Sequence, residues 1–88
     1  MKDETKTNLL ARVKRIKGQI GGVRRMAEDG RKCQDIITQL VAIRSAVDSL
    51  GLIVLDAQLR DKMKEGDGTD IDSLHALEKA VKVWSRTG

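Results

Sequence analysis

The stretch that decides the fold is KCQDIITQLVAIRSAVDSLGLIVLDAQLRDKMK, residues 32–64. Its apolar residues recur at alternating intervals of four and three, a spacing that keeps one face of an α-helix apolar. Seven residues form this stripe, namely Ile36, Leu40, Ile43, Val47, Leu50, Val54 and Ala57. Other apolar residues widen it, at positions 37, 41, 46 and 53. We therefore expect one long helix, roughly 50 Å from end to end, with a broad apolar face.

A second helical pattern precedes this stretch, over about residues 6–29. The same spacing is kept there by Leu9, Val13, Ile16, Ile20, Val23 and Ala27. Gly30 follows directly and is placed to end the helix, because glycine adopts the left-handed conformation common at helix ends.

A third, shorter helix is expected over about residues 71–86, after a turn at residues 65–70 (EGDGTD). Asp70 or Asp72 is placed to cap it. Its apolar face would consist of Leu74, Leu77, Val81 and Trp84. We expect Trp84 to be a packing residue. The chain has no Pro, Phe or Tyr and no strictly alternating β-branched run, so the predicted fold is all-α, one domain over residues 1–88.

Size predicts that this domain does not stand alone. A chain of 88 residues covers its apolar surface poorly without disulfides, metals or partner subunits, and the single cysteine, Cys33, rules out an internal disulfide. The long helix is also longer than either neighbour. We therefore expect two copies of a three-helix subunit to form a dimer with a four-helix core.

The charge of the chain is concentrated in its first third. Residues 1–32 hold ten Lys and Arg against four Asp and Glu, a net +6, whereas residues 33–88 hold seven against nine, a net −2. A basic helix suits a polyanion such as DNA, although many basic helix faces are merely solvated. No signal peptide or membrane span is evident, so we expect a cytoplasmic protein that does not engage a membrane. One histidine and one cysteine make no catalytic constellation, and we expect no enzyme.

Four blocks of sequence together resemble one protein family. They are RVKRIKGQIGGVRRM (residues 12–26), KCQDIITQL (32–40), AIRSAVDSLG (42–51) and LDAQLRDKM (55–63). They look like the CsoR/RcnR family of copper-sensor-like transcriptional repressors, and the resemblance extends from about residue 9 to 84. It implies an antiparallel dimer that forms a four-helix bundle, a dimer-of-dimers homotetramer, and operator DNA that is bound without a helix-turn-helix and released when an inducer binds.

The resemblance directs the basic residues toward DNA phosphates. The candidate contacts are Arg12, Lys14, Arg15, Lys17, Arg24, Arg25 and, on the second helix, Arg44. The same block holds Gly18, Gly21 and Gly22, and each costs about 1 kcal/mol relative to alanine in a helix. Close packing of another backbone is the favoured explanation, and close approach to the DNA backbone is the alternative.

For the inducer, the resemblance implies a site between subunits. Cys33 holds the first position of the family's metal site, but Gln58 and Lys62 stand where metal sensors have histidine and then cysteine or histidine. Since Cys33 and position 58 are about 37 Å apart along one helix, only an antiparallel partner can join them. Glu78 matches the family's third-helix glutamate, Lys32 replaces a tyrosine, and the only histidine, His75, lies outside the pattern and is expected on the surface.

An amide and a protonated lysine are poor ligands for a soft metal, so we expect no metal cofactor. Cys33 lies at a helix start beside Arg31 and Lys32, a setting that favours a thiolate, so the preferred inducer is an electrophile, an aldehyde, or a reactive sulfur or oxidant species. The family's persulfide and formaldehyde sensors use a second cysteine or an N-terminal proline, and both are missing here. The alternatives are a repressor that responds to Cu(I) or another transition metal through a non-standard site that includes Cys33, a metal-binding helical module, and a structural bundle without an inducer.

Overall fold

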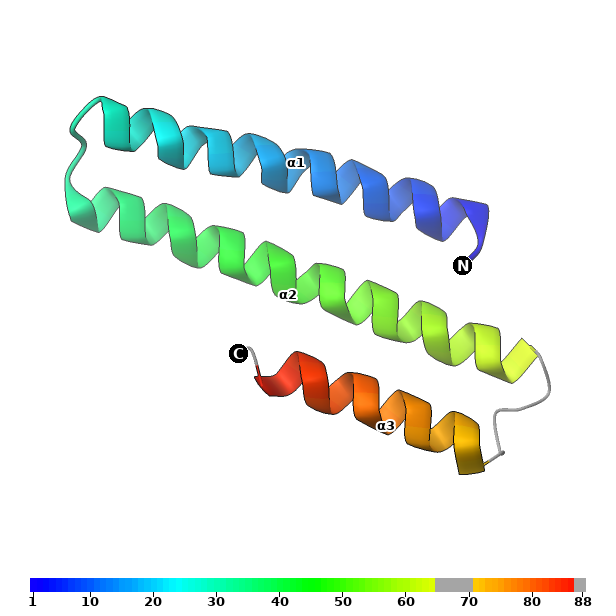
Figure 1. Ribbon diagram of the computed structural model, residues 1–88. Coiled ribbons are helices and arrows are strands. Elements are labelled where there is room, and N and C mark those ends of the chain that lie inside the picture. Colours follow the sequence, from blue (N-terminus) through cyan, green and yellow to red (C-terminus); the bar gives the residue numbers. More distant parts are fainter. Residues whose placement is uncertain (65–70, 87–88) are drawn as a thin grey trace.

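The computed structural model describes residues 1–64 and 71–86, which form three α-helices: α1 (Asp3–Glu28), α2 (Cys33–Lys64) and α3 (Ile71–Arg86) (Figure 1). These ranges contain no strand, so the all-α prediction is confirmed. α1 begins three residues before the expected start, and its first turn holds Asp3 and Glu4, whose charges favour a helix N-terminus. The predicted turn at 65–70, Asp70 and the side chain of Asp72 lie outside the described residues.

Gly30 ends α1 as the sequence predicts. Its φ of 69° lies in the left-handed region, where a residue with a Cβ is strained. Two backbone hydrogen bonds close the turn: Arg31 N–H donates to the Met26 carbonyl at 2.9 Å, and Gly30 N–H to the Ala27 carbonyl at 3.3 Å. This is the Schellman arrangement, which satisfies the last carbonyls of a helix and reverses the chain toward α2.

The three helices lie side by side in one layer. α1 and α3 pack on opposite sides of α2, each antiparallel to it, and α3 covers only the C-terminal half of α2 (Figure 1). The principal extents of the Cα trace are 54 × 28 × 13 Å, so the subunit is a slab about as thick as one helix. Its radius of gyration is 16.9 Å, against about 12 Å for a compact domain of this length.

A one-layer slab buries very little. The buried apolar residues among those described are Ile16, Ile43 and Ala57, and none of the three is fully buried. The accessible surface is 6991 Å², whereas a compact monomer of 9.7 kDa exposes about 5100 Å². About 1900 Å² is therefore exposed in excess, an area similar to that of a stable protein interface.

The apolar stripe of α2 divides into two rows. Ile43 and Ala57 are buried, and Ile36 and Leu50, in the same row, are half-buried. The second row stays exposed, with relative accessibilities of 47% at Leu40, 36% at Val47 and 43% at Val54. The rows differ because α1 covers only one edge of a stripe broader than a single helix can cover. No helix in the described ranges has the length and apolar character needed to cross a membrane.

Candidate DNA-binding surface and inducer site

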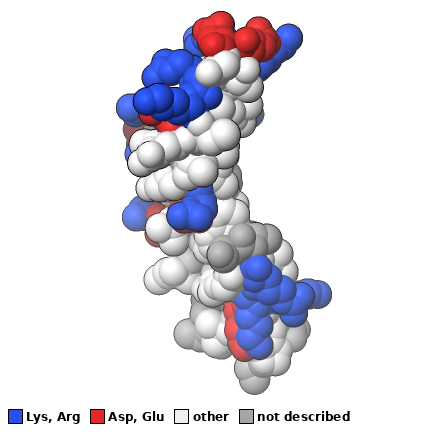
Figure 2. Space-filling view, turned by 90° about the vertical axis from the view of Figure 1, so that its left-hand side faces the viewer, with Lys and Arg blue, Asp and Glu red and all other residues white. Residues whose placement is uncertain are grey.

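The seven basic residues predicted to contact DNA are all exposed. Since a helix turns about 100° per residue, those on α1 spread around every side of it except the one that Ile16 buries. On the face that Figure 2 draws, basic groups gather near the top, near the middle and near the bottom of the view, with acidic groups beside them and uncharged surface between. Because all seven basic residues are exposed, the candidates are distinguished by the groups that surround each of them.

Arg24 is already engaged with an acidic partner. Its Nε donates to Glu28 Oε1 at 2.8 Å, one turn further along α1. Both side chains are well exposed, so the pair contributes little to stability. It does, however, reduce the positive charge that Arg24 presents to an anion.

Arg12 and Arg15 line a polar groove between α1 and α2, with a cavity volume of about 450 Å³. Arg12 Nε donates to Asn8 Oδ1 at 3.2 Å, which holds that guanidinium at the rim. α2 supplies a floor of small residues, namely Ala42, Ser45, Ala46 and Ser49. Ser45 and Ser49 add hydroxyl groups that the sequence reading did not select. The four small residues of this floor recur at intervals of three and four, a spacing that could have indicated a small, polar helix face from the sequence.

The glycines of α1 do not pack against another backbone of this subunit. A Cβ added at Gly18 would meet nothing within 4 Å, and one at Gly21 or Gly22 would meet only the Arg25 guanidinium, at 3.7 and 3.8 Å. The packing explanation therefore finds no support within one subunit. Close approach to the DNA backbone, the alternative explanation, stays a prediction.

A different glycine, Gly51 of α2, does have a close neighbour. A Cβ built on it would overlap the Trp84 indole, whose Cδ2 lies 2.8 Å away and whose Cε2 and Cζ2 lie closer still. Trp84 therefore rests directly on the α2 backbone and anchors α3, as expected of a packing residue. The sequence reading missed Gly51, although a glycine inside a long helical pattern is a known sign of close approach.

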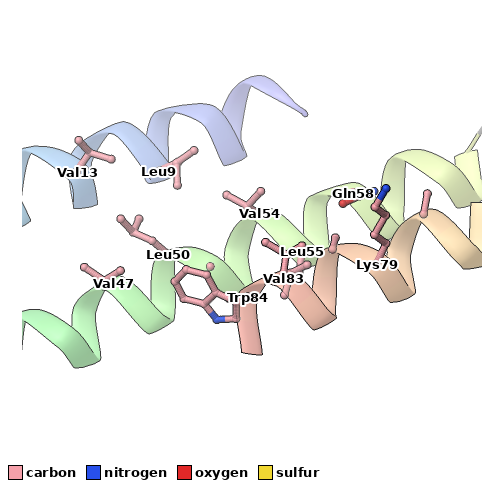
Figure 3. A pocket seen from close by; sticks show the side chains of 13 residues that line it. Leu9, Val13, Val47, Leu50, Val54, Leu55, Gln58, Lys79, Val83 and Trp84 are labelled. Carbon is pink, nitrogen blue, oxygen red and sulfur yellow. The ribbon is translucent and has the colours of Figure 1, made fainter. Parts of the chain in front are cut away.

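An apolar groove of about 700 Å³ opens on the other side of the α1–α2 pair. Leu9 and Val13 of α1 line it, as do Val47, Leu50 and Val54 of α2 and Val83 and Trp84 of α3 (Figure 3). Gln58 and Lys79 provide polar groups at its end near the C-terminus of α2 (Figure 3). The groove contains Val47 and Val54 of the exposed row of the α2 stripe, so it presents an apolar surface that no part of the described subunit covers.

The four residues predicted to sense the inducer are not brought together within one subunit. Cys33 is exposed at the first turn of α2, and Gln58 lies about 37 Å further along the same helix. Lys62 is half-buried one turn beyond Gln58. Glu78 is exposed and forms an ion pair with Lys82 Nζ at 3.1 Å, whereas the charged α3 residue that lines the groove with Gln58 is Lys79. A site that contains both Cys33 and Gln58 therefore needs two subunits.

The surroundings of Cys33 also differ in part from those expected. Arg31, one of the flanking cations, pairs with Asp35 at 3.2 Å. His75 is exposed on α3, on the surface where it was expected. Within residues 1–64 and 71–86, no three His, Cys, Asp or Glu side chains are grouped closely enough to hold a metal ion. The described residues of one subunit therefore do not form a metal site by themselves.

The three helices therefore leave an apolar groove on one side of the α1–α2 pair and a basic, polar groove on the other. A family model described as "metal-sensitive transcriptional repressor" matches residues 5–86. The chain belongs to this family, and it is a transcriptional repressor of the CsoR type, as the sequence blocks indicated.

Relatives and solved structures agree with this membership. The chain is 36% identical to the copper-sensing transcriptional repressor CsoR of Bacillus subtilis, over 72% of this chain and 66% of that protein. It is 39% identical to the copper-sensing transcriptional repressor RicR of Mycobacterium tuberculosis, over 64% of this chain and 58% of that protein. An uncharacterized protein of Serratia marcescens from the bioA 5′ region is 36% identical over 85% of this chain and 82% of its own length.

Two solved structures share the fold. The copper-sensing repressor CsoR of Geobacillus thermodenitrificans, crystallised with Cu(I), gives a TM-score of 0.79 at 34% identity and covers 97% of this chain and 91% of its own. The nickel-responsive regulator InrS gives a TM-score of 0.76 at 28% identity, over 89% of this chain and 90% of its own.

These comparisons correct the expectation about cofactors. We expected no metal cofactor, because Gln58 and Lys62 replace the ligands of metal sensors. That expectation is wrong, since two of the relatives and both solved structures are named as copper-sensing or nickel-responsive, and one was solved with Cu(I). The preferred electrophile or reactive-sulfur inducer receives no support from them, and the metal-responsive alternative fits them better.

Proposed function

We propose that this chain is a homo-oligomeric repressor that binds operator DNA in the cytoplasm and whose affinity for DNA is controlled by a transition-metal ion. The observation that carries the proposal is the two-sidedness of the slab. The apolar groove beside Val47 and Val54 opens on one side, and the groove with Arg12 and Arg15 opens on the other. One side is suited to a second subunit and the other to a polyanion.

The apolar side supports a dimer. Placing a second slab antiparallel on it turns one layer into two and covers Leu40, Val47 and Val54, whose exposure in water is unfavourable. α2 also carries a third apolar row, which is exposed as well, with relative accessibilities of 59% at Ile37, 63% at Leu52 and 64% at Met63. Because the two exposed rows lie on different faces of α2, they support two kinds of contact between subunits, as in a dimer-of-dimers tetramer.

The metal response is proposed from the family and the names of its members. Cys33 is the only thiol of the chain and is exposed, so it is the residue expected to bind the ion, in a site formed between subunits. Gln58 and Lys62 remain at that site as neighbours and not as soft ligands. The donor set of this chain therefore departs from the family pattern at two positions.

DNA binding in the presence of metals tests the proposal. The probe is a duplex from the region upstream of the gene that encodes the chain, followed by fluorescence anisotropy without oxygen. We expect Cu(I) or Ni(II), buffered by a competing chelator, to weaken binding by about 5- to 150-fold, the usual range of allosteric coupling. Cys33→Ser should bind the duplex and lose the response, whereas the control His75→Ala should retain it.

Two results would contradict the proposal in different ways. Native protein that does not bind the duplex at low salt would remove DNA from the function. Native protein that binds it, ignores every transition metal tested and releases it with formaldehyde or sodium tetrasulfide would make the inducer a reactive molecule.

A further inference from the structure

The polar groove between α1 and α2 has the properties of an anion site. Its ten lining residues include two guanidinium groups, Arg12 and Arg15, and no Asp or Glu. Ser45 and Ser49 of α2 stand on the opposite wall. The Ser49 hydroxyl donates to the Ser45 carbonyl at 3.2 Å, so it is oriented along α2, and the exposed Ser45 hydroxyl lies one turn before it.

The groove also contains a buried polar atom. Oε1 of Gln19 is inaccessible to solvent, and no described residue donates a hydrogen bond to it. A buried acceptor without a partner is unfavourable, so natural proteins rarely keep one without a use. Arg15 lies four residues before Gln19 on the same side of α1, within reach of it. On the same rim Arg12 is held by the amide of Asn8, also four residues away, at 3.2 Å.

The position of the groove keeps it open in a dimer formed through the apolar groove. Ser45 and Val47 point about 160° apart around α2, and so do Arg15 and Val13 around α1. The polar and apolar grooves share no lining residue and open on opposite sides of the helix pair. Subunits that join through the apolar groove therefore leave the polar groove facing outward.

From this geometry we infer that the polar groove seats a backbone phosphate of DNA between Arg12 and Arg15 of α1 and the Ser45 hydroxyl of α2, with Gln19 as the residue that positions Arg15. The inference rests on the proposed function and deepens it. It divides the basic residues into two groups: Arg12 and Arg15 hold a phosphate in a shaped site, whereas Lys14, Lys17, Arg24 and Arg25 lie outside this groove. It also makes α2 part of the DNA-binding surface through a small polar residue.

A phosphate contact does not depend on base sequence, so the probe can be a random-sequence duplex of about three helical turns, alongside the duplex from upstream of the gene. Ser45→Glu places a carboxylate where the phosphate would lie, and we expect both duplexes to bind at least about tenfold more weakly at 0.1 M NaCl. Ser85→Glu makes the same change at an exposed serine of α3 and should bind like native protein. Arg15→Ala should reduce the slope of log K against log salt by about 0.9 for each subunit in contact.

Gln19→Leu separates a positioning role from a structural one. Removing a buried acceptor that has no donor in the free protein should raise the midpoint of urea unfolding. DNA binding should weaken, because Arg15 loses the acceptor that orients it when the phosphate is bound. A purely structural role would leave DNA affinity unchanged in a folded variant.

Three outcomes would overturn the inference. Native protein that binds both duplexes while Ser45→Glu binds them equally well would reject the groove and leave the proposed function intact. Ser45→Glu that changes the sedimentation coefficient and leaves DNA affinity unaltered would make the groove a contact between subunits. Inorganic phosphate that raises the melting temperature of native protein but not of Ser45→Glu, with DNA affinity equal in the two, would make it a site for a free anion.

Discussion

Replacing glycine by alanine should have opposite effects on stability at Gly18 and at Gly51. Alanine is favoured over glycine inside a helix by about 1 kcal/mol, so Gly18→Ala, with open space around its Cβ, should stabilise the protein by about that amount. At Gly51 the new methyl group would overlap the Trp84 indole, and the indole must move away. α3 would then lose its anchor on α2.

The size of the effect follows from how much of Trp84 is buried. A fully buried tryptophan removes about 200 Å² from water, and Trp84 is half-buried, so its release exposes about 100 Å², or about 2.5 kcal/mol. Subtracting the gain of about 1 kcal/mol in helix propensity leaves Gly51→Ala about 1.5 kcal/mol less stable than native protein. The two variants should therefore differ by about 2.5 kcal/mol.

Intrinsic fluorescence gives a direct assay. Trp84 is the only tryptophan and the chain has no tyrosine, so emission reports on the seating of α3. Gly51→Ala should shift the emission maximum to longer wavelength and increase quenching by acrylamide, whereas Gly18→Ala should leave both unchanged. Urea unfolding at a fixed protein concentration measures the stabilities, since assembly contributes to them. A native emission spectrum in Gly51→Ala would refute the reasoning.

Two further predictions concern assembly and the turn after α1. Val47→Glu puts a charge into the exposed apolar row, so we expect sedimentation velocity to show a smaller species than native protein at the same concentration. Thr38→Glu, on another side of α2, should assemble normally. A native oligomer in Val47→Glu would exclude this face from the dimer. Gly30→Ala introduces a Cβ at φ 69° and should lower the free energy of unfolding by about 1 kcal/mol. Gly30→Asn should lower it less, because asparagine tolerates this conformation better. Equal losses in the two variants would argue against the left-handed turn.

The number of helices and their approximate limits were readable from the sequence. Helical periodicity is a local property, because residues three and four apart share a face whatever packs against it. The concentration of positive charge before residue 33 and the single thiol at Cys33 are equally local facts. Apolar stripes broader than any neighbouring helix could cover also indicated a chain that assembles.

The tertiary structure decided which part of each pattern is used. Ile43 and Val47 belong to one apolar stripe, yet only Ile43 is buried, because α1 covers one edge of α2 and leaves the other open. Gly51 meets Trp84 across 33 positions of sequence, and Arg15 meets the small residues around Ser45 across 30. Periodicity along one helix contains no information about which residues of another helix lie opposite. That depends on how α1 and α3 are placed along α2, so the anchor of α3 and the polar groove became visible only in the folded subunit.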